Sequence, residues 1–213
     1  MIIKRTKAPS KIIALGLNYR DHIGELGFKA ADKPVIFIKP DTSVIGDGEN
    51  IIITVEGRVD YEAELAFVIS KDCKNVRAED ADEYILGYTC LNDVTARDIQ
   101  KADGQWTRAK SYDTFCPIGN YIVSDIDVSN LVIGTMVNGE IRQQGNTSDM
   151  ILSVPEILEY VSSVMTLRKG DVISTGTPYG VGEIRHGDTV EVFIEGVGTL
   201  QNKVIKNSQG NKN

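Results

Sequence analysis

Turn signals recur along this chain at intervals of about ten residues, and they constrain its fold more than any other feature. Between them lie short runs rich in valine and isoleucine, at residues 51–55, 64–70, 131–137, 171–175 and 189–194. Such runs, when bounded by glycine-containing turns, are typical of β-strands. The pairs Asn138-Gly139 and Glu195-Gly196 each predict a tight hairpin between two strands. We therefore expect an α+β fold in which strands dominate.

Helical patterns are few and short, at residues 20–26, 79–87, 94–101 and 154–167. Gly27 and Gly87 are expected to end the first two, because glycine readily adopts the left-handed conformation that follows a helix. Ser153 and Pro155 mark the expected start of the last one. No repeat or linker divides the chain, so we predict a single domain over residues 1–206 and a frayed polar tail over 207–213.

The composition narrows the classes of ligand. The chain has 213 residues with 30 acidic and 23 basic side chains, so its net charge is −7. It has no cluster of lysine and arginine that could neutralise phosphates, which argues against nucleic acid as a partner. No apolar run approaches the roughly 20 residues that span a bilayer, and we expect a soluble cytoplasmic protein without a membrane partner. An anionic ligand would then need a metal ion or a few local cations.

Two acidic elements suggest a metal site. Glu62 and Glu64 alternate along a predicted strand, so both side chains point to the same face. Asp93 follows another apolar run at a predicted strand-to-helix junction. Together the three carboxylates would form an all-oxygen site for Mg²⁺ or Mn²⁺. The spacing leaves open whether they meet: the glutamates could instead lie on a solvated edge strand, and Asp93 could cap a helix.

A possible general base occurs near the N-terminus. On a helix, His22 and Glu25 would share a face, and the carboxylate would orient the imidazole and raise its basicity. A surface ion pair between the same two residues is the alternative interpretation. The other histidine, His186, lies in a glycine-containing turn and is expected to be a solvated loop residue.

Two irregular segments complete the set of candidates. Residues 100–119 lack periodicity and contain Trp106 and Lys110, and long irregular segments of compact domains are often functional. Lys110 could hold an anionic group, or it could be an ordinary exposed lysine. Residues 175–182 are rich in glycine but lack the lysine of a phosphate-binding loop, so their backbone N–H groups could instead face a carboxylate.

Several motifs in this order resemble the fumarylacetoacetate hydrolase family, in particular its short acylpyruvase and 2-hydroxyhepta-2,4-diene-1,7-dioate isomerase-like branch. They are GLNYRDH at 16–22, IFIKPDTSVIGDG at 36–48, VDYEAELAFVI at 59–69, GYTCLNDVTARDIQ at 87–100, QWTRAKSYDTFCPIG at 105–119, VNGEIRQ at 137–143, GDVISTGTPYGVG at 170–182 and GDTVEV at 187–192. The resemblance implies a mixed β-sandwich roll with few helices and a homodimer.

The resemblance also assigns roles to the candidate residues. It implies metal ligands at Glu62, Glu64 and Asp93 and a catalytic dyad of His22 and Glu25. It further implies that Lys110 stabilises an oxyanion or enolate. Substrate contacts are implied at Gln100, Gly176 and Thr177, the last two receiving the substrate carboxylate.

From these roles we expect a Mg²⁺- or Mn²⁺-dependent hydrolase that cleaves a C–C bond in acylpyruvate-type 2,4-diketo acids. The partner would be a small anionic keto acid. Isomerisation of 2-hydroxyhepta-2,4-diene-1,7-dioate and decarboxylation of oxaloacetate are the nearest alternatives, because all three reactions pass through an enolate next to a metal. A non-enzymatic protein that merely holds a structural ion is a further alternative.

Overall fold

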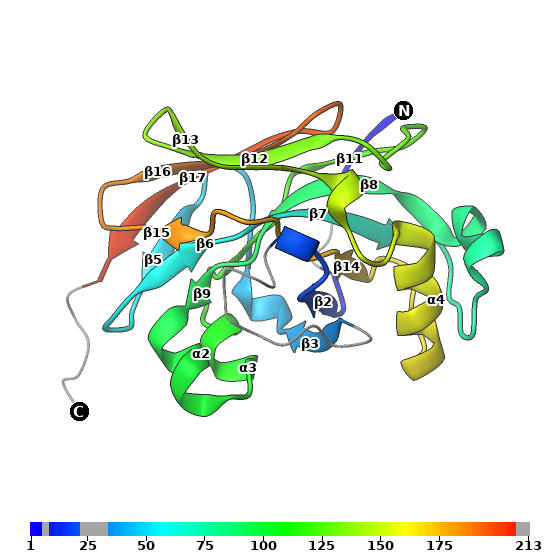
Figure 1. Ribbon diagram of the computed structural model, residues 1–213, viewed down its shortest axis with the longest axis horizontal. Coiled ribbons are helices and arrows are strands. Elements are labelled where there is room, and N and C mark those ends of the chain that lie inside the picture. Colours follow the sequence, from blue (N-terminus) through cyan, green and yellow to red (C-terminus); the bar gives the residue numbers. More distant parts are fainter. Residues whose placement is uncertain (6–8, 22–33, 208–213) are drawn as a thin grey trace.

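Strands form most of the regular structure in the computed structural model, which describes residues 1–5, 9–21 and 34–207 (Figure 1). The strands are β1 (Ile2–Lys4), β2 (Ile12–Gly16), β3 (Val35–Lys39), β4 (Val44–Ile45), β5 (Asn50–Ile53), β6 (Val59–Tyr61), β7 (Ala63–Ile69), β8 (Ile85–Asn92), β9 (Thr95–Ala96), β10 (Cys116–Pro117), β11 (Tyr121–Val123), β12 (Val132–Val137), β13 (Glu140–Asn146), β14 (Val172–Ser174), β15 (Gly182–Glu183), β16 (Thr189–Ile194) and β17 (Gly198–Lys206). The helices are α2 (Arg97–Asp103), α3 (Thr107–Lys110) and α4 (Val154–Val164), with 3₁₀ turns η1 (Asp41–Ser43), η2 (Ala78–Tyr84) and η3 (Thr147–Asp149). The strand-dominated fold that the sequence predicts is confirmed.

Two large sheets face each other across the main core. One has seven strands in the order β1-β11-β8-β7-β14-β2-β3, and the other has five in the order β13-β12-β16-β17-β5. Leu65 and Phe67 of β7 pack in the same cluster as Ile133 of β12 and Val192 of β16. Both sheets are mixed, since β14 and β2 pair in parallel, as do β17 and β5, among otherwise antiparallel strands. In Figure 1, α4 lies at one end of this sandwich and α2 and α3 lie at the other.

A smaller sheet connects the large ones to the candidate site. It has the order β15-β6-β9, and its residues Val59, Tyr61 and Ala96 belong to a second buried cluster. The chain passes directly from β6 through Glu62 into β7, the central strand whose seven residues are all buried. The two glutamates therefore enter the interior of the protein with this strand instead of lying on a solvated edge.

Both predicted hairpins are present. Asn138 and Gly139 have φ values of 54° and 82° and join β12 to β13, as the two-residue turn requires. A three-residue turn, Glu195 to Val197, joins β16 to β17, and Gly196 in it has a φ of 71°. Cys73, Cys90 and Cys116 are all buried free thiols.

Two of the predicted helices differ from the structure. Residues 78–84 form only the 3₁₀ turn η2, because the apolar run that follows belongs to β8, and Gly87 lies inside that strand. A side chain at Gly87 would approach the carbonyl oxygen of Val123 to 2.6 Å, so close pairing with β11 explains this glycine. Helix α2 starts at Arg97, since Thr95 pairs with β6, and ends before Gly104, whose φ is 68°.

Most of the predicted helix 20–26 and of the predicted tail lies outside the described residues.

Helix α4 begins as the sequence predicts, and its cap gives a first testable expectation. The Oε2 atom of Glu156 accepts hydrogen bonds from the backbone N–H of Ser153 at 2.8 Å and from its hydroxyl at 2.6 Å. We expect Ser153→Ala to lower the free energy of unfolding by about 1 kcal/mol in urea denaturation. An equal loss in Ser208→Ala, in the predicted tail, would show that the cap is not the cause.

None of the helices in the described part of the chain is long and apolar enough to cross a membrane.

Candidate metal centre

Three carboxylates meet at the end of the seven-stranded sheet where β7 begins and β8 ends. Glu62 precedes β7, Glu64 is its second residue, and Asp93 follows β8. The two strands are antiparallel with Ala63 opposite Asn92, so Asp93 lies beside Glu62 and its N–H donates to the Glu62 carbonyl oxygen at 2.9 Å. Carboxylate oxygens of the three residues lie within 4.8 Å of one another. The side chains are only 4%, 1% and 0% exposed, so this is an interior cluster.

Buried cations partly neutralise this cluster. Lys110 Nζ donates to Glu62 Oε2 at 2.8 Å and to Asp93 Oδ2 at 2.6 Å. Lys39 Nζ donates to Asp93 Oδ1 at 2.5 Å. Arg97 donates to Glu62 Oε1 at 2.6 Å and to Asp60 Oδ2 at 2.8 Å. Lys110 is thus a buried residue of the site and not an exposed lysine.

Glu64 lacks such a partner. Its Oε2 accepts hydrogen bonds from the Ser174 hydroxyl and, at 3.1 Å, from the Gly176 N–H, but no lysine or arginine of the described residues forms an ion pair with it. Burial raises the pKa of Glu64 well above its usual value, and the neighbouring charges of Asp93 and Glu62 raise it further. A divalent cation between the three carboxylates would offset both the burial of the Glu64 charge and its repulsion by Asp93 and Glu62.

The donor set therefore fits a hard divalent ion. Three carboxylates supply only oxygen atoms, and no cysteine or histidine of the described residues joins them. Mg²⁺ and Mn²⁺ bind through such oxygens and leave further positions for water or substrate. The cluster could hold a metal ion of this class.

The predicted substrate-contact residues lie around the same point. A small cavity of about 10 Å³ is lined by Leu15, Gly16, Leu17, Glu62, Glu64, Asp93, Arg97, Gln100, Trp106, Lys110 and Thr177. Gln100 Oε1 accepts a hydrogen bond from Arg97 at 2.7 Å, and the Thr177 hydroxyl accepts one from Gln143 Nε2 at 2.8 Å. The structure thus brings Gln100 and Thr177 to the three carboxylates. Gly176 is not among the lining residues, and its N–H donates to Glu64 Oε2.

Three residues of this arrangement were not singled out from the sequence: Lys39, Arg97 and Gln143. Lys39 is the last residue of β3 and shares its buried face with Phe37. A lysine at the inward position of a strand is a signal that could have found it, because lysine is almost never fully buried without a partner. Arg97 and Gln143 offered no comparable signal.

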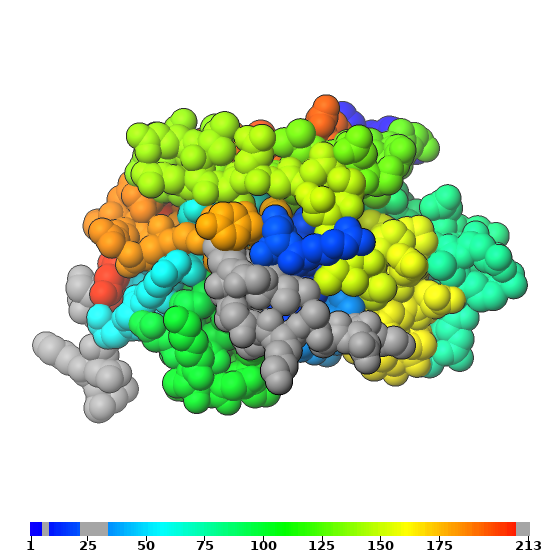
Figure 2. Space-filling model, viewed as in Figure 1, coloured from blue at the N-terminus to red at the C-terminus, as the bar shows by residue number. Residues whose placement is uncertain are grey.

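The chain that leads toward the predicted dyad is firmly anchored, whereas His22 and Glu25 themselves lie outside the described residues. The Asn18 side chain donates to the carbonyl oxygens of Leu152 and Thr175 at 3.1 and 2.9 Å and accepts from the Leu152 N–H at 2.9 Å. The Tyr179 N–H donates to Asp21 Oδ2 at 3.3 Å. Figure 2 shows this blue segment against the orange C-terminal part of the chain.

The other histidine behaves as predicted for a loop residue. His186 lies in an exposed turn, where its Nδ1 accepts a hydrogen bond from the Lys206 N–H at 3.2 Å.

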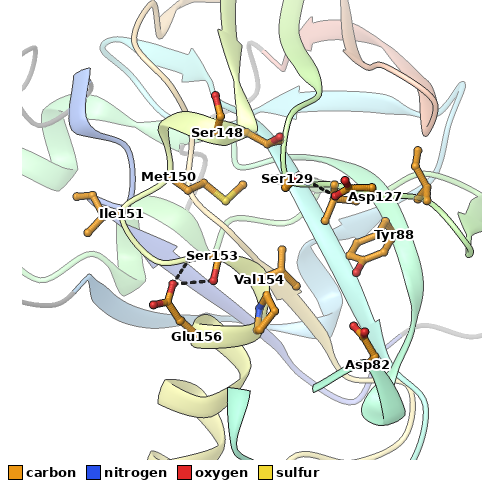
Figure 3. Close-up of a pocket in the computed structure, with 14 residues that line it drawn as sticks. Asp82, Tyr88, Asp127, Ser129, Ser148, Met150, Ile151, Ser153, Val154 and Glu156 are labelled. Carbon is orange, nitrogen blue, oxygen red and sulfur yellow. Dashed lines mark hydrogen bonds between the residues drawn. The ribbon is translucent and has the colours of Figure 1, made fainter. Parts of the chain in front are cut away.

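A larger cavity, of about 580 Å³, lies near the start of α4 and is a weaker candidate (Figure 3). Its carboxylates are used locally: Glu156 caps α4, and Asp127 accepts a hydrogen bond from the Ser129 N–H at 2.9 Å. In Figure 3 Asp82, Asp127 and Glu156 lie apart and do not point to a common centre. No metal-ligating group of the described residues converges there.

Comparisons with known proteins agree with the motifs. The family described as "Fumarylacetoacetate (FAA) hydrolase C-terminal" matches residues 11–205. The oxaloacetate tautomerase YisK of Bacillus subtilis is 44% identical over 92% of this chain and 70% of its own length. The structure titled 5-carboxymethyl-2-hydroxymuconate delta-isomerase from Mycobacterium smegmatis is 50% identical, with a TM-score of 0.89, over 95% of this chain and 81% of that one. The 2-hydroxyhepta-2,4-diene-1,7-dioate isomerase of Mycobacterium marinum is 49% identical, with a TM-score of 0.88, over 95% and 77%.

Proposed function

Because this chain belongs to the fumarylacetoacetate hydrolase family, we propose that it is a divalent-metal-dependent enzyme that moves a proton next to the 2-oxo group of a small keto acid. Keto–enol interconversion of oxaloacetate, or isomerisation of a related unsaturated 2-oxo diacid, is the reaction class. The observation that carries the proposal is the buried cluster of Glu62, Glu64 and Asp93 with Lys110 hydrogen-bonded to two of its members.

Glu62, Glu64 and Asp93 would hold the ion. When bound, Mg²⁺ or Mn²⁺ would supply a Lewis acid for the carboxylate and 2-oxo oxygens of the substrate.

Lys110 is suited to stabilise negative charge on the substrate. Burial disfavours its charged form, but the carboxylates of Asp93 and Glu62 outweigh this effect and the pKa of Lys110 is raised. The ammonium group therefore stays protonated and can donate to the oxygen on which the enolate charge develops. Gln100 and Thr177, which line the same cavity, would bind polar groups of the substrate and fix its orientation.

Proton transfer is favoured over hydrolysis by the relatives. YisK is named a tautomerase, and both solved structures described above are titled isomerases. These reactions need a base that takes up one proton, stabilisation of the enolate and an acid that returns a proton at the other position, but no attacking water.

Hydrolysis of acylpyruvates is the second candidate. The helical spacing of His22 and Glu25 supports it, because an imidazole oriented by a carboxylate can activate water. Loss of CO₂ from oxaloacetate would use the same charge stabilisation without an attacking water.

A substrate panel tests the proposal. Oxaloacetate, acetylpyruvate, fumarylpyruvate and 2-hydroxyhepta-2,4-diene-1,7-dioate would each be assayed with Mg²⁺ and with EDTA. Enol loss, C–C cleavage and CO₂ release would be followed separately. We expect enol–keto interconversion of at least one 2-oxo diacid with Mg²⁺ and its loss in EDTA. Equal rates with Mg²⁺ and EDTA would contradict the proposal.

Lys110→Met should lower kcat for this reaction by roughly 10²- to 10³-fold, the usual effect of removing one donor from a developing oxyanion. Mg²⁺ affinity should persist in calorimetry, because Lys110 donates to the carboxylates and is not a ligand. The exposed Lys101→Met in α2 is the matched control and should keep the wild-type kcat. An unchanged kcat in Lys110→Met would remove this residue from the reaction.

A further inference from the structure

Trp106 forms an aromatic wall beside the carboxylate cluster. It immediately precedes α3, and its carbonyl oxygen accepts a hydrogen bond from the Lys110 N–H at 3.1 Å. Trp106 and Lys110 are thus one helical turn apart, and the Lys110 ammonium lies 6.0 Å from the indole centroid. The indole meets the Phe37 ring edge-on, with centroids 5.5 Å apart and an interplanar angle of 70°. Two elements distant in the sequence therefore hold it next to the charged centre.

Gly16 explains how the indole comes so close to the end of β2. A side chain at this position would place its Cβ 2.0 Å from Cζ3 of Trp106, far inside van der Waals contact. The ring therefore lies directly against the backbone of Gly16. Both residues line the cavity, so the Gly16 backbone and the indole packed on it form one continuous part of its wall.

The cavity is too small for a substrate as it stands. Its volume of about 10 Å³ corresponds to roughly one water molecule. The strand residues of its lining, such as Leu15 and Glu64, are fully packed, whereas Trp106 is half-buried and follows an exposed stretch at 101–105. The indole is therefore the part of the lining that a ligand has to displace or pack against.

The lining combines two kinds of residue. Its charged members are Glu62, Glu64, Asp93, Arg97 and Lys110, and its apolar members are Leu15, Leu17 and Trp106. A 2-oxo acid whose carboxylate and keto oxygen lie at the charged residues would place the rest of the molecule against the apolar ones, among which the indole is the largest.

We propose that Trp106 is the specificity-determining residue of this site, and that its indole restricts the group carried beyond the 2-oxo acid unit to a short, non-aromatic one. The ligand class rests on the proposed function, while the role of the wall rests on the contacts of Trp106 with Gly16 and Phe37.

Binding of two inert analogues tests this role without requiring turnover. Oxamate contains the 2-oxo acid unit with no substituent, and oxanilate contains the same unit with a phenyl group. Their affinities would be measured by calorimetry with saturating Mg²⁺ for the wild type, Trp106→Ala and Trp106→Phe. We expect Trp106→Ala to improve oxanilate binding relative to oxamate by about 10-fold or more, within the range for a change in one pocket wall. Trp106→Phe, which preserves an aromatic ring, should give a smaller change in the same direction.

Intrinsic fluorescence gives an independent readout, because Trp106 is the only tryptophan of the chain. Titration of the Mg²⁺-loaded wild type with oxanilate should change the emission with the same dissociation constant as calorimetry. Tyr121→Ala, an exposed aromatic residue of β11 outside the cavity lining, is the matched control and should leave the affinity ratio unaltered.

An unchanged oxanilate-to-oxamate ratio in folded Trp106→Ala and Trp106→Phe would overturn the inference. Binding of oxanilate to the wild type without any change in the Trp106 emission would overturn it as well. Failure of the proposed function would be distinct, since the analogues would still bind while no 2-oxo acid would be converted.

Discussion

Glu64→Gln is expected to abolish Mg²⁺ binding and metal-dependent turnover while the chain stays folded. The substitution removes one of three negative charges but keeps an oxygen that can accept the hydrogen bonds from Ser174 and Gly176. Calorimetry should show no saturable Mg²⁺ binding, and thermal unfolding should no longer respond to Mg²⁺. In the wild type, Mg²⁺ at about 100 times its dissociation constant should add roughly 2.7 kcal/mol to the free energy of unfolding.

The same variant should be more stable than the wild type when both are metal-free at neutral pH. The pKa of Glu64 is raised in the folded state, so its ionised form opposes folding. This cost is absent below the usual glutamate pKa of about 4.3, grows as the pH rises, and is complete above the raised pKa. Glu64→Gln removes it, so the difference in unfolding free energy should grow with pH in EDTA.

Glu183→Gln serves as the control for both measurements, because Glu183 is an exposed carboxylate of β15 outside the cluster. Its Mg²⁺ affinity should equal that of the wild type. Unchanged Mg²⁺ affinity in Glu64→Gln would contradict the assignment of this residue as a ligand.

His22→Ala is expected to separate hydrolysis from the reactions that need no attacking water. If His22 and Glu25 activate water, both His22→Ala and Glu25→Gln should slow acetylpyruvate hydrolysis by roughly 10²- to 10⁴-fold. Decarboxylation of oxaloacetate should suffer less in Glu25→Gln, because it draws on the metal ligands and Lys110. Mg²⁺ affinity should persist in both variants, since a general base is not a ligand.

The matched control is His186→Ala, which alters the exposed turn histidine and should leave every rate unchanged. Equal losses of hydrolysis and decarboxylation in Glu25→Gln would argue for a purely positional role of that segment. Loss of Mg²⁺ affinity in His22→Ala would make His22 a metal ligand.

Local features of the fold could be predicted from the sequence where one short segment determines the outcome. The turn at Asn138-Gly139 follows from backbone conformations that asparagine and glycine tolerate, and the start of α4 follows from Ser153 and Glu156. The prediction of a helix over residues 79–87 was wrong, because the acidic residues at its start belong to η2 and the apolar run after them belongs to β8. Pairing of that run with β7 and β11 favours the strand, and these long-range contacts cannot be read from the local sequence.

In the candidate site, too, some features follow from the local sequence and others only from contacts between distant segments. The common face of Glu62 and Glu64 follows from strand alternation, which a sequence displays directly. The proximity of Asp93 depends on the register of β7 against β8, and the sequence does not reveal it. Lys39 and Arg97 come from β3 and α2, so their ion pairs with the carboxylates emerge only when the sheets are assembled.

The most direct test of the account is a titration with Mn²⁺ in which free Mn²⁺ is measured by electron paramagnetic resonance. The wild type should bind one Mn²⁺ per chain, in competition with Mg²⁺, and the doubly substituted Glu62→Gln, Glu64→Gln protein should bind none with comparable affinity. The absence of saturable Mn²⁺ binding to the wild type, or equal stoichiometry and affinity in the doubly substituted protein, would contradict a metal centre at Glu62, Glu64 and Asp93.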